Sequence, residues 1–130
     1  MIVDANVLSS AILGRSLPLL LEIQGRGIEL LMPLHQFSEA KNVAARKAGW
    51  SEDRFERFAS GVIAVLPVND YVRGERFARA RLGSRGQPDW PVLAAAIELG
   101  DAIWTNDRDF FGVGVAVWTT DNIKFAEKAS

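Results

Sequence analysis

Short apolar runs alternate with helical patterns along the whole chain, and this alternation limits the folds that it can adopt. Five runs have the length and apolar character of buried strands. They cover residues 1–3, 28–32, 62–65, 102–104 and 115–118. The segments between them carry apolar residues at helical spacing. Strands separated by helices predict an α/β fold with a parallel sheet that is covered by helices on both faces.

Glycine and proline mark the ends of several predicted elements. Helices are expected at residues 4–13, 18–24, 34–48, 54–58, 70–82, 90–99 and 121–128. Gly49 and Gly100 follow two of them, and Pro33 is expected to end the second strand. The stretch 84–88 is expected to be a loop.

Burial can be predicted for parts of this pattern. The helix at 90–99 is apolar on all sides, which is typical of a buried helix. Trp104 and Trp118 lie in predicted strands, so they are expected to belong to the core. Asn69 or Asp70 is expected to cap the arginine-rich helix that follows.

Length and composition favour one globular domain spanning residues 1–130. The chain has 130 residues, 48% of them hydrophobic and 24% charged, as in soluble proteins with a single core. Its apolar runs are far shorter than the roughly 20 residues of a membrane span. No basic and apolar leader precedes the first strand. A cytoplasmic protein with no membrane partner is therefore expected.

The residue types present restrict the available chemistry. The chain has no cysteine, which excludes disulfides and thiolate chemistry. Its one histidine, His35, is too few for a structural zinc site and is expected at a helix start or on the surface. The net charge of −1 excludes binding to nucleic acid by bulk charge alone. Any catalytic machinery must therefore consist of carboxylates, arginines, hydroxyls and amides.

Acidic residues follow the strands or begin helices that lead into them. Asp4 follows the first strand, and Asp107 lies just beyond the strand at 102–104. Glu39 lies on the helix after the second strand, and Asp89 begins the buried helix. Ligands of open α/β sheets bind beyond the carboxyl ends of the strands, so these acids can meet at one edge of the sheet.

Each acid also has a structural explanation that the sequence leaves open. Asp4 and Asp89 are suited to cap the helices that follow them. Glu39 can lie on a solvated helix face. Asp107 and Asp109 can form an Asx-type turn. Only the grouping of the acids favours a functional site.

A pocket shared by four or five carboxylates would need cations, because mutual repulsion raises pKa values and costs stability. Mg²⁺ and Mn²⁺ take carboxylate oxygens as ligands. Two such ions about 3.5–4 Å apart would stabilise the attacking and leaving oxygens in phosphodiester hydrolysis. This chemistry needs neither histidine nor cysteine.

The order of these motifs resembles the PIN domain family. The matching parts are D-x-N at 4–6, Glu39 on the third helix, DWPVLAAA at 89–96 and TNDRDF at 105–110. The chain is also similar in size to the VapC-like toxins of prokaryotic toxin–antitoxin pairs. The resemblance implies a three-layer α/β/α sandwich with a mostly parallel central sheet. It also implies a metal-dependent endoribonuclease that cleaves single-stranded RNA. The bulky Trp90–Pro91 pair departs from the commoner form of the family.

The resemblance assigns roles to particular side chains. It implies that the catalytic and metal-binding acids are Asp4, Glu39, Asp89 and Asp107, with Asp109 as a further metal ligand. Asn6 and Thr105 would orient the carboxylates or a water molecule. The implied cofactor is Mg²⁺ or Mn²⁺. Asp121, which follows the similar stretch AVWTT, is expected to cap the last helix.

The expected partners follow from the same resemblance and from the basic residues. The resemblance implies an RNA substrate, a cognate antitoxin protein and a homodimer. Arg85, Arg108 and Arg46 lie near the acids in sequence and are candidate phosphate contacts. One alternative is a non-catalytic PIN-like module that binds a protein through residues 18–23 and 50–65. Another is a PIN nuclease that acts in RNA processing or on DNA.

Overall fold

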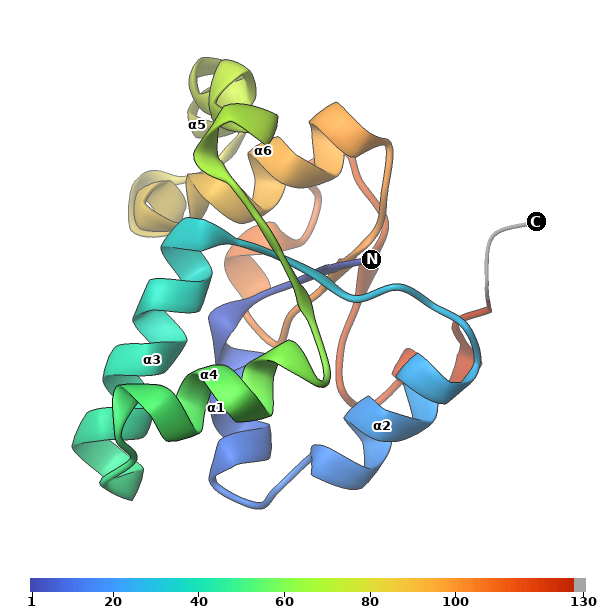
Figure 1. Ribbon diagram of the computed structural model, residues 1–130. Coiled ribbons are helices and arrows are strands. Elements are labelled where there is room, and N and C mark those ends of the chain that lie inside the picture. Colours follow the sequence, from blue (N-terminus) through green and yellow to red (C-terminus); the bar gives the residue numbers. More distant parts are fainter. Residues whose placement is uncertain (128–130) are drawn as a thin grey trace.

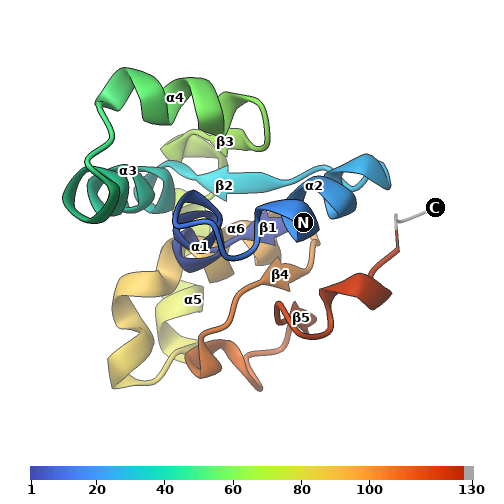
Figure 2. The same ribbon diagram turned by 90° about the horizontal axis from the view of Figure 1, so that it is seen from below.

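Helices surround a single sheet (Figure 1), whose five parallel strands lie in the order β3–β2–β1–β4–β5 (Figure 2). The computed structural model describes residues 1–127. The strands are β1 (Ile2–Val3), β2 (Leu31–Pro33), β3 (Ala64–Leu66), β4 (Ile103–Trp104) and β5 (Val117–Trp118). The α-helices are α1 (Ala5–Ile12), α2 (Leu17–Gly25), α3 (Leu34–Ala48), α4 (Glu52–Ser60), α5 (Glu75–Arg81) and α6 (Trp90–Leu99). The predicted parallel α/β sheet is confirmed.

Hydrophobic cores lie on both faces of this sheet. Val3 and Trp104 belong to the core with α1, α2, α3 and α4. Ile2 and Ile103 belong to the core with α5 and α6. Successive residues of a strand point to opposite faces, and all four side chains are fully buried. The predicted three-layer α/β/α sandwich is therefore confirmed.

Helix α6 is buried along most of its length, as its apolar sequence predicts. Its residues 92–96 are at most 1% exposed. The helix ends at Gly100, which has a left-handed backbone with φ 62°. Gly74 packs so closely that a Cβ atom there would lie 3.2 Å from Cβ and 3.3 Å from Cα of Ala94. Small residues on both sides thus fix the position of α6.

Two strands are shifted from their predicted positions. β2 covers Leu31–Pro33 and not 28–32, so Pro33 belongs to the strand. Pro33 pairs only with Leu66 of β3, where a missing N–H at the end of the strand is tolerated. β3 covers Ala64–Leu66 and not 62–65, because the N–H groups of Val62 and Ile63 both donate to the Ala59 carbonyl oxygen at the end of α4 (3.0 and 2.9 Å).

The predicted arginine-rich helix at 70–82 is shorter than expected. Two 3₁₀ helices, Val68–Asp70 and Val72–Gly74, precede α5. Tyr71 joins them with φ −137° and ψ −11°, and its side chain is fully buried. Burial of this ring interrupts the helix. Gly74 lies at the N-cap position of α5, so the prediction of a cap at Asn69 or Asp70 is wrong.

The segment at 84–88 was expected to be a loop, and the structure shows a 3₁₀ helix over Ser84–Asp89. The Gln87 amide donates hydrogen bonds to the carbonyl oxygens of Arg79 (2.8 Å) and Leu82 (3.0 Å). These side-chain bonds to preceding carbonyl groups order a segment whose composition is typical of a loop.

The closing helix predicted at 121–128 is only a 3₁₀ helix over Ile123–Phe125, and Lys128 lies outside the described residues. Asn122 and not Asp121 occupies the N-cap position, and its Oδ1 accepts a hydrogen bond from the Thr119 N–H (2.8 Å). Trp118 is half-buried, in contrast to the fully buried Trp104.

No single helix in residues 1–127 has the length and apolar composition needed to cross a membrane. The pair formed by α1 and α2 passes that test together and is bent by 119° at the break.

The close packing of Gly74 on α6 predicts a specific loss of stability. We expect Gly74→Ala to lower the free energy of unfolding by about 1–3 kcal/mol, because the new methyl group meets backbone atoms of a buried helix. Chemical denaturation measures this change. Gly83→Ala is the matched control, since nothing lies within 4 Å of a Cβ atom there. Equal stability of the two variants would contradict the packing described above.

Candidate functional site

Four acidic residues come together at the edge of the sheet where β1, β2 and β4 end. Asp4 follows β1, Asp107 lies beyond β4, Glu39 lies in the second turn of α3, and Asp89 begins α6. The negative charges of Glu39 and Asp107 both raise the pKa of Asp4. The charges of Asp4, Asp107 and Glu39 raise the pKa of Asp89. We call these four side chains the acidic cluster.

Asp4 is held rigidly at the centre of the acidic cluster. Val3 pairs with Trp104, and the Asp4 N–H donates to the Trp104 carbonyl oxygen (3.0 Å), so Asp4 lies beside Thr105. The Thr105 hydroxyl donates to Asp4 Oδ2 (2.7 Å), and the Asn6 amide donates to the same oxygen (3.1 Å). Both Asp4 and Thr105 are buried. The register of two parallel strands thus creates this contact across 101 residues of sequence.

The helix-capping explanation of Asp4 is also correct. Asp4 is the N-cap residue of α1, and its Oδ1 accepts a hydrogen bond from the Ala5 N–H (2.7 Å). Its other oxygen still faces Thr105 and Asn6. One carboxylate therefore serves both the helix and the acidic cluster.

Asp89 occupies the N-cap position of α6, but its side chain does not cap the helix. It accepts no hydrogen bond from a backbone N–H group there. Burial raises the pKa of Asp89, and the negative charges of Asp4, Asp107 and Glu39 raise it further. The Asp89 carboxyl group therefore belongs to the acidic cluster and not to the helix.

Asp107 shows the turn geometry that its sequence allows. Its Oδ1 accepts a hydrogen bond from the Asp109 N–H (2.9 Å) at the start of the 3₁₀ helix Arg108–Phe110. The Asp107 N–H donates to the Thr105 hydroxyl oxygen (3.0 Å). Thr105 thus links Asp4 to Asp107. Asp109 packs near Gly86 and is not among the groups that shift the pKa of Asp4 or Asp89.

Burial and crowding of negative charge raise the pKa of two members of the acidic cluster, Asp4 and Asp89. Burial raises the pKa of Asp4 to about 6, against the hydrogen bonds from Thr105 and Ala5, which lower it. Burial and three neighbouring carboxylates raise the pKa of Asp89 to about 7. The ordinary value for both is 3.8. The charged forms are thus destabilised in the absence of a cation.

The donor set has the chemistry of a site for a hard divalent cation. Carboxylate oxygens are the preferred ligands of Mg²⁺ and Mn²⁺. Within residues 1–127, no three acidic or imidazole side chains converge closely enough to ligate one ion as they stand. Glu39 is exposed, so ligation of one ion by three of these carboxylates requires their side chains to rearrange. Mutual repulsion opposes that rearrangement until a cation is bound.

The three candidate arginines lie at different positions around the acidic cluster. Arg108 begins the 3₁₀ helix that directly follows Asp107. Arg85 lies in the 3₁₀ helix that ends at Asp89, and these two 3₁₀ helices contact each other. Arg46 lies seven residues beyond Glu39, about 10 Å along α3. All three are exposed, and none forms an ion pair within the described part of the chain.

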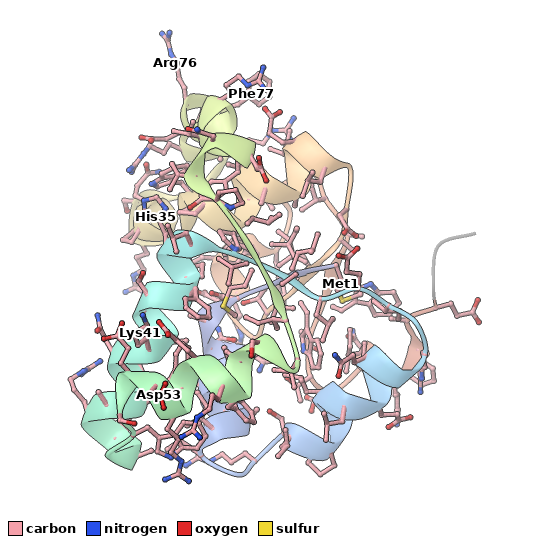
Figure 3. All side chains as sticks on the ribbon, viewed as in Figure 1. Met1, His35, Lys41, Asp53, Arg76 and Phe77 are labelled. Atoms are coloured by element: carbon pink, nitrogen blue, oxygen red, sulfur yellow. The ribbon has the colours of Figure 1, made fainter. Side chains whose placement is uncertain are left out.

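An aromatic cluster beside the acids was not predicted from the sequence. His35 lies at the start of α3 (Figure 3), as expected for a histidine at a helix start, and its ring is 5.2 Å from the ring of Trp90. The Tyr71 hydroxyl contacts His35 Nδ1 and also accepts a hydrogen bond from the His35 N–H (3.3 Å). These contacts join α3 to α6 and so position Glu39 relative to Asp89. Trp90 directly follows Asp89 in sequence, but nothing in the sequence identifies Tyr71 as its partner.

The raised pKa values predict how stability depends on pH in the metal-free protein. The folded state binds more protons than the unfolded state between about pH 4 and 7, so the free energy of unfolding falls as pH rises through this window. The titration of Asp4 alone lowers the free energy of unfolding by on the order of 2–3 kcal/mol across this window. Denaturation in the presence of a chelator at several pH values measures the slope.

Two variants separate this effect from ordinary surface titration. Asp4→Asn reduces the slope because it removes one of the two carboxyl groups whose pKa is raised. Asp53→Asn, on the exposed face of α4 (Figure 3), leaves the slope unchanged. A stability that stays constant or rises across this window in the wild-type protein is incompatible with the acidic cluster as described.

Comparison with known proteins gives one family and two similar structures. Residues 2–128 match the family model described as PIN domain. One of the two structures is the crystal structure of VapBC2 from Rickettsia felis bound to a DNA fragment from its promoter. A chain of that structure is similar to this one, with a TM-score of 0.71 and 15% identity. That match covers 91% of this chain and 96% of the other.

The second structure is a toxin–antitoxin complex from Klebsiella pneumoniae. Its TM-score is 0.65 at 20% identity, and the match covers 92% of this chain and 96% of the other. No curated protein has a matching sequence. At these identities the two structures establish a shared fold.

Proposed function

The chain belongs to the PIN domain family, and we propose that it is a divalent-metal-dependent endoribonuclease that hydrolyses single-stranded RNA. The observation that carries this proposal is the acidic cluster itself. Four carboxyl groups from four segments lie at one edge of the sheet, and burial raises the pKa of two of them. A protein gains no stability from such an arrangement unless cations bind there.

The metal would be held by the acidic cluster, with Asp109 as a further ligand after a small rearrangement. Bound Mg²⁺ or Mn²⁺ would supply an activated water molecule and would stabilise negative charge on the oxygens of the phosphodiester. The remaining contributions come from the chain itself. Thr105 and Asn6 hold the Asp4 carboxylate in one orientation by hydrogen bonds. The lone pairs that accept no hydrogen bond therefore point in a fixed direction.

The positions of the arginines support contacts to the substrate. Arg108 directly follows Asp107 in the chain, Arg85 lies four residues before Asp89, and both are exposed, so we assign them to phosphates on either side of the cleaved bond. Arg46 lies farther along α3, so its contact would involve a more distant phosphate. Arginine binds phosphate oxygens through paired N–H donors, which suits this role.

The biological role that we propose is that of the toxin in a toxin–antitoxin pair. One similar structure is a toxin–antitoxin complex and the other is VapBC2, whose name matches the VapC-like toxins that the sequence resembles, and each match covers nearly all of both chains. We therefore expect a cognate antitoxin protein, a homodimer and action in the cytoplasm. Nucleases of RNA processing and of DNA share the same metal chemistry, so the assay below includes both substrates.

A non-catalytic binding module is less well supported. Such a module has no need for buried, proton-retaining carboxylates, which lower stability near neutral pH. The segments at 18–23 and 50–65, which are candidate partner surfaces, contribute Leu20, Ile23, Phe55 and Ala59 to the core.

Loss of single carboxylates tests the proposed activity. We expect Asp4→Asn and Asp107→Asn to reduce cleavage of single-stranded RNA by at least about 100-fold, because each removes a charge that holds the ions. The assay uses a labelled RNA and the matching DNA strand with Mg²⁺ or Mn²⁺, and a chelator stops the wild-type reaction. Asp53→Asn is the control, because it also removes one negative charge but lies on α4, outside the acidic cluster.

Two results would refute the proposal. One is cleavage at the wild-type rate by both variants, which would point to a contaminating nuclease. The other is no cleavage of either strand by the folded wild-type protein with either metal. Faster cleavage of DNA than of RNA would change the proposed substrate but retain the proposed site.

A further inference from the structure

A groove between α1 and α3 leads away from the acidic cluster. The two helices lie side by side and contact each other (Figure 1). The groove has a volume of about 290 Å³. Its polar lining consists of Asn6, Ser9, Ser10, Arg15, Glu39 and Lys47. Asn6 and Glu39 belong to the candidate site, so the groove and the acidic cluster are continuous.

The lining changes character along the groove. Glu39, Val43 and Lys47 are four residues apart on α3, so they form one face that spans about 12 Å. The groove is thus acidic at the end that adjoins the cluster and basic at the end formed by Lys47 and Arg15. Ser9 and Ser10 lie between these ends on α1 and are half-buried. Their hydroxyl groups are hydrogen-bond donors of the kind that contact phosphate and sugar oxygens.

The two basic side chains are available for a ligand. Arg15 and Lys47 are exposed, and neither forms an ion pair with another of residues 1–127. Lys47 lies in the last turn of α3, where the helix dipole favours a cation. Arg15 lies beyond the end of α1 and directly before Ser16, the N-cap residue of α2. The helix dipole therefore does not explain why both charges meet over one groove that begins at the acidic cluster.

We propose that this groove binds the sugar–phosphate backbone of the RNA strand beyond the cleaved phosphodiester. This inference rests on the proposed function. Arg15 and Lys47 pair with a phosphate, and Ser9 and Ser10 donate hydrogen bonds to the segment between that phosphate and the site. Lys47, and not its neighbour Arg46, lines the groove. The groove would then determine the minimum length of a tightly bound RNA.

Binding experiments test the groove separately from catalysis. The protein carries Asp107→Asn so that it cannot cleave, and fluorescence anisotropy measures its affinity for labelled oligouridylates of two and eight nucleotides. We expect Arg15→Gln with Lys47→Gln to weaken binding of the octanucleotide about tenfold at moderate salt. The slope of log affinity against log salt should decrease by about 0.7, since the contact with one phosphate is lost. The dinucleotide is too short to extend from the acidic cluster to Arg15 and Lys47, so the double substitution should not change its affinity.

A matched variant controls for net charge. Arg57→Gln with Lys124→Gln removes two exposed charges that do not line the groove, and it should leave both affinities within twofold of the parent. Ser9→Ala with Ser10→Ala retains all charges and should weaken binding of the octanucleotide but not of the dinucleotide. Thermal melting of each variant establishes that it is folded.

Three results would overturn the inference. The first is an octanucleotide affinity that Arg15→Gln with Lys47→Gln does not change. The second is an equal loss in the Arg57→Gln, Lys124→Gln control, which would indicate a general charge effect. The third is displacement of the RNA from the groove by a polyglutamate peptide at the same concentration, which would indicate a protein ligand. Binding that depends on the groove, together with no cleavage by the wild-type chain, would instead refute the proposed function and leave the groove as an RNA site.

Discussion

The pairing of β1 with β4 is the constraint on which the rest of the site depends. It aligns Val3 with Trp104, so the next residues, Asp4 and Thr105, lie side by side where both strands end. The hydrogen bond between them then fixes one carboxylate and, through the Thr105 hydroxyl, the backbone of Asp107. β2 and the buried helix α6 add Glu39 and Asp89 at the same edge. A shift of one residue in this register would direct each side chain to the opposite face of the sheet.

The acidic cluster illustrates a conflict between stability and function. The burial that orders Asp4 also raises its pKa to about 6, and the proximity that assembles the four carboxyl groups makes them repel one another. The cores on the two faces of the sheet must offset this cost. The contacts of Tyr71 and Trp90 with His35 add a rigid link between α3 and α6 beside the acids. Proteins commonly accept such local destabilisation at sites that bind ions or substrates.

The sequence predicts the layers of the fold and the edge of the sheet where the acids meet, because the period of apolar residues and the order of strands are local signals. It does not predict elements that depend on the contacts of one particular side chain. Tyr71 interrupts a helical pattern because its ring is buried, and Gln87 orders a loop-like segment through carbonyl groups of α5 and the residues that follow. The two explanations offered for Asp4 also prove compatible, since one oxygen caps α1 and the other faces the cluster. The groove lined by Arg15 and Lys47 was not predicted, because two exposed cations 32 positions apart show no shared pattern.

A crystal soaked in manganese tests the central claim most directly, since anomalous scattering locates the ion without reference to activity. The account predicts a strong peak about 2.1 Å from carboxylate oxygens of Asp4 and Asp107, with Asp89 and Glu39 turned toward it. A second peak about 3.5–4 Å away would indicate a two-ion site. Well-ordered carboxylates with no peak between them, or a peak bound only to surface acids elsewhere, would contradict it.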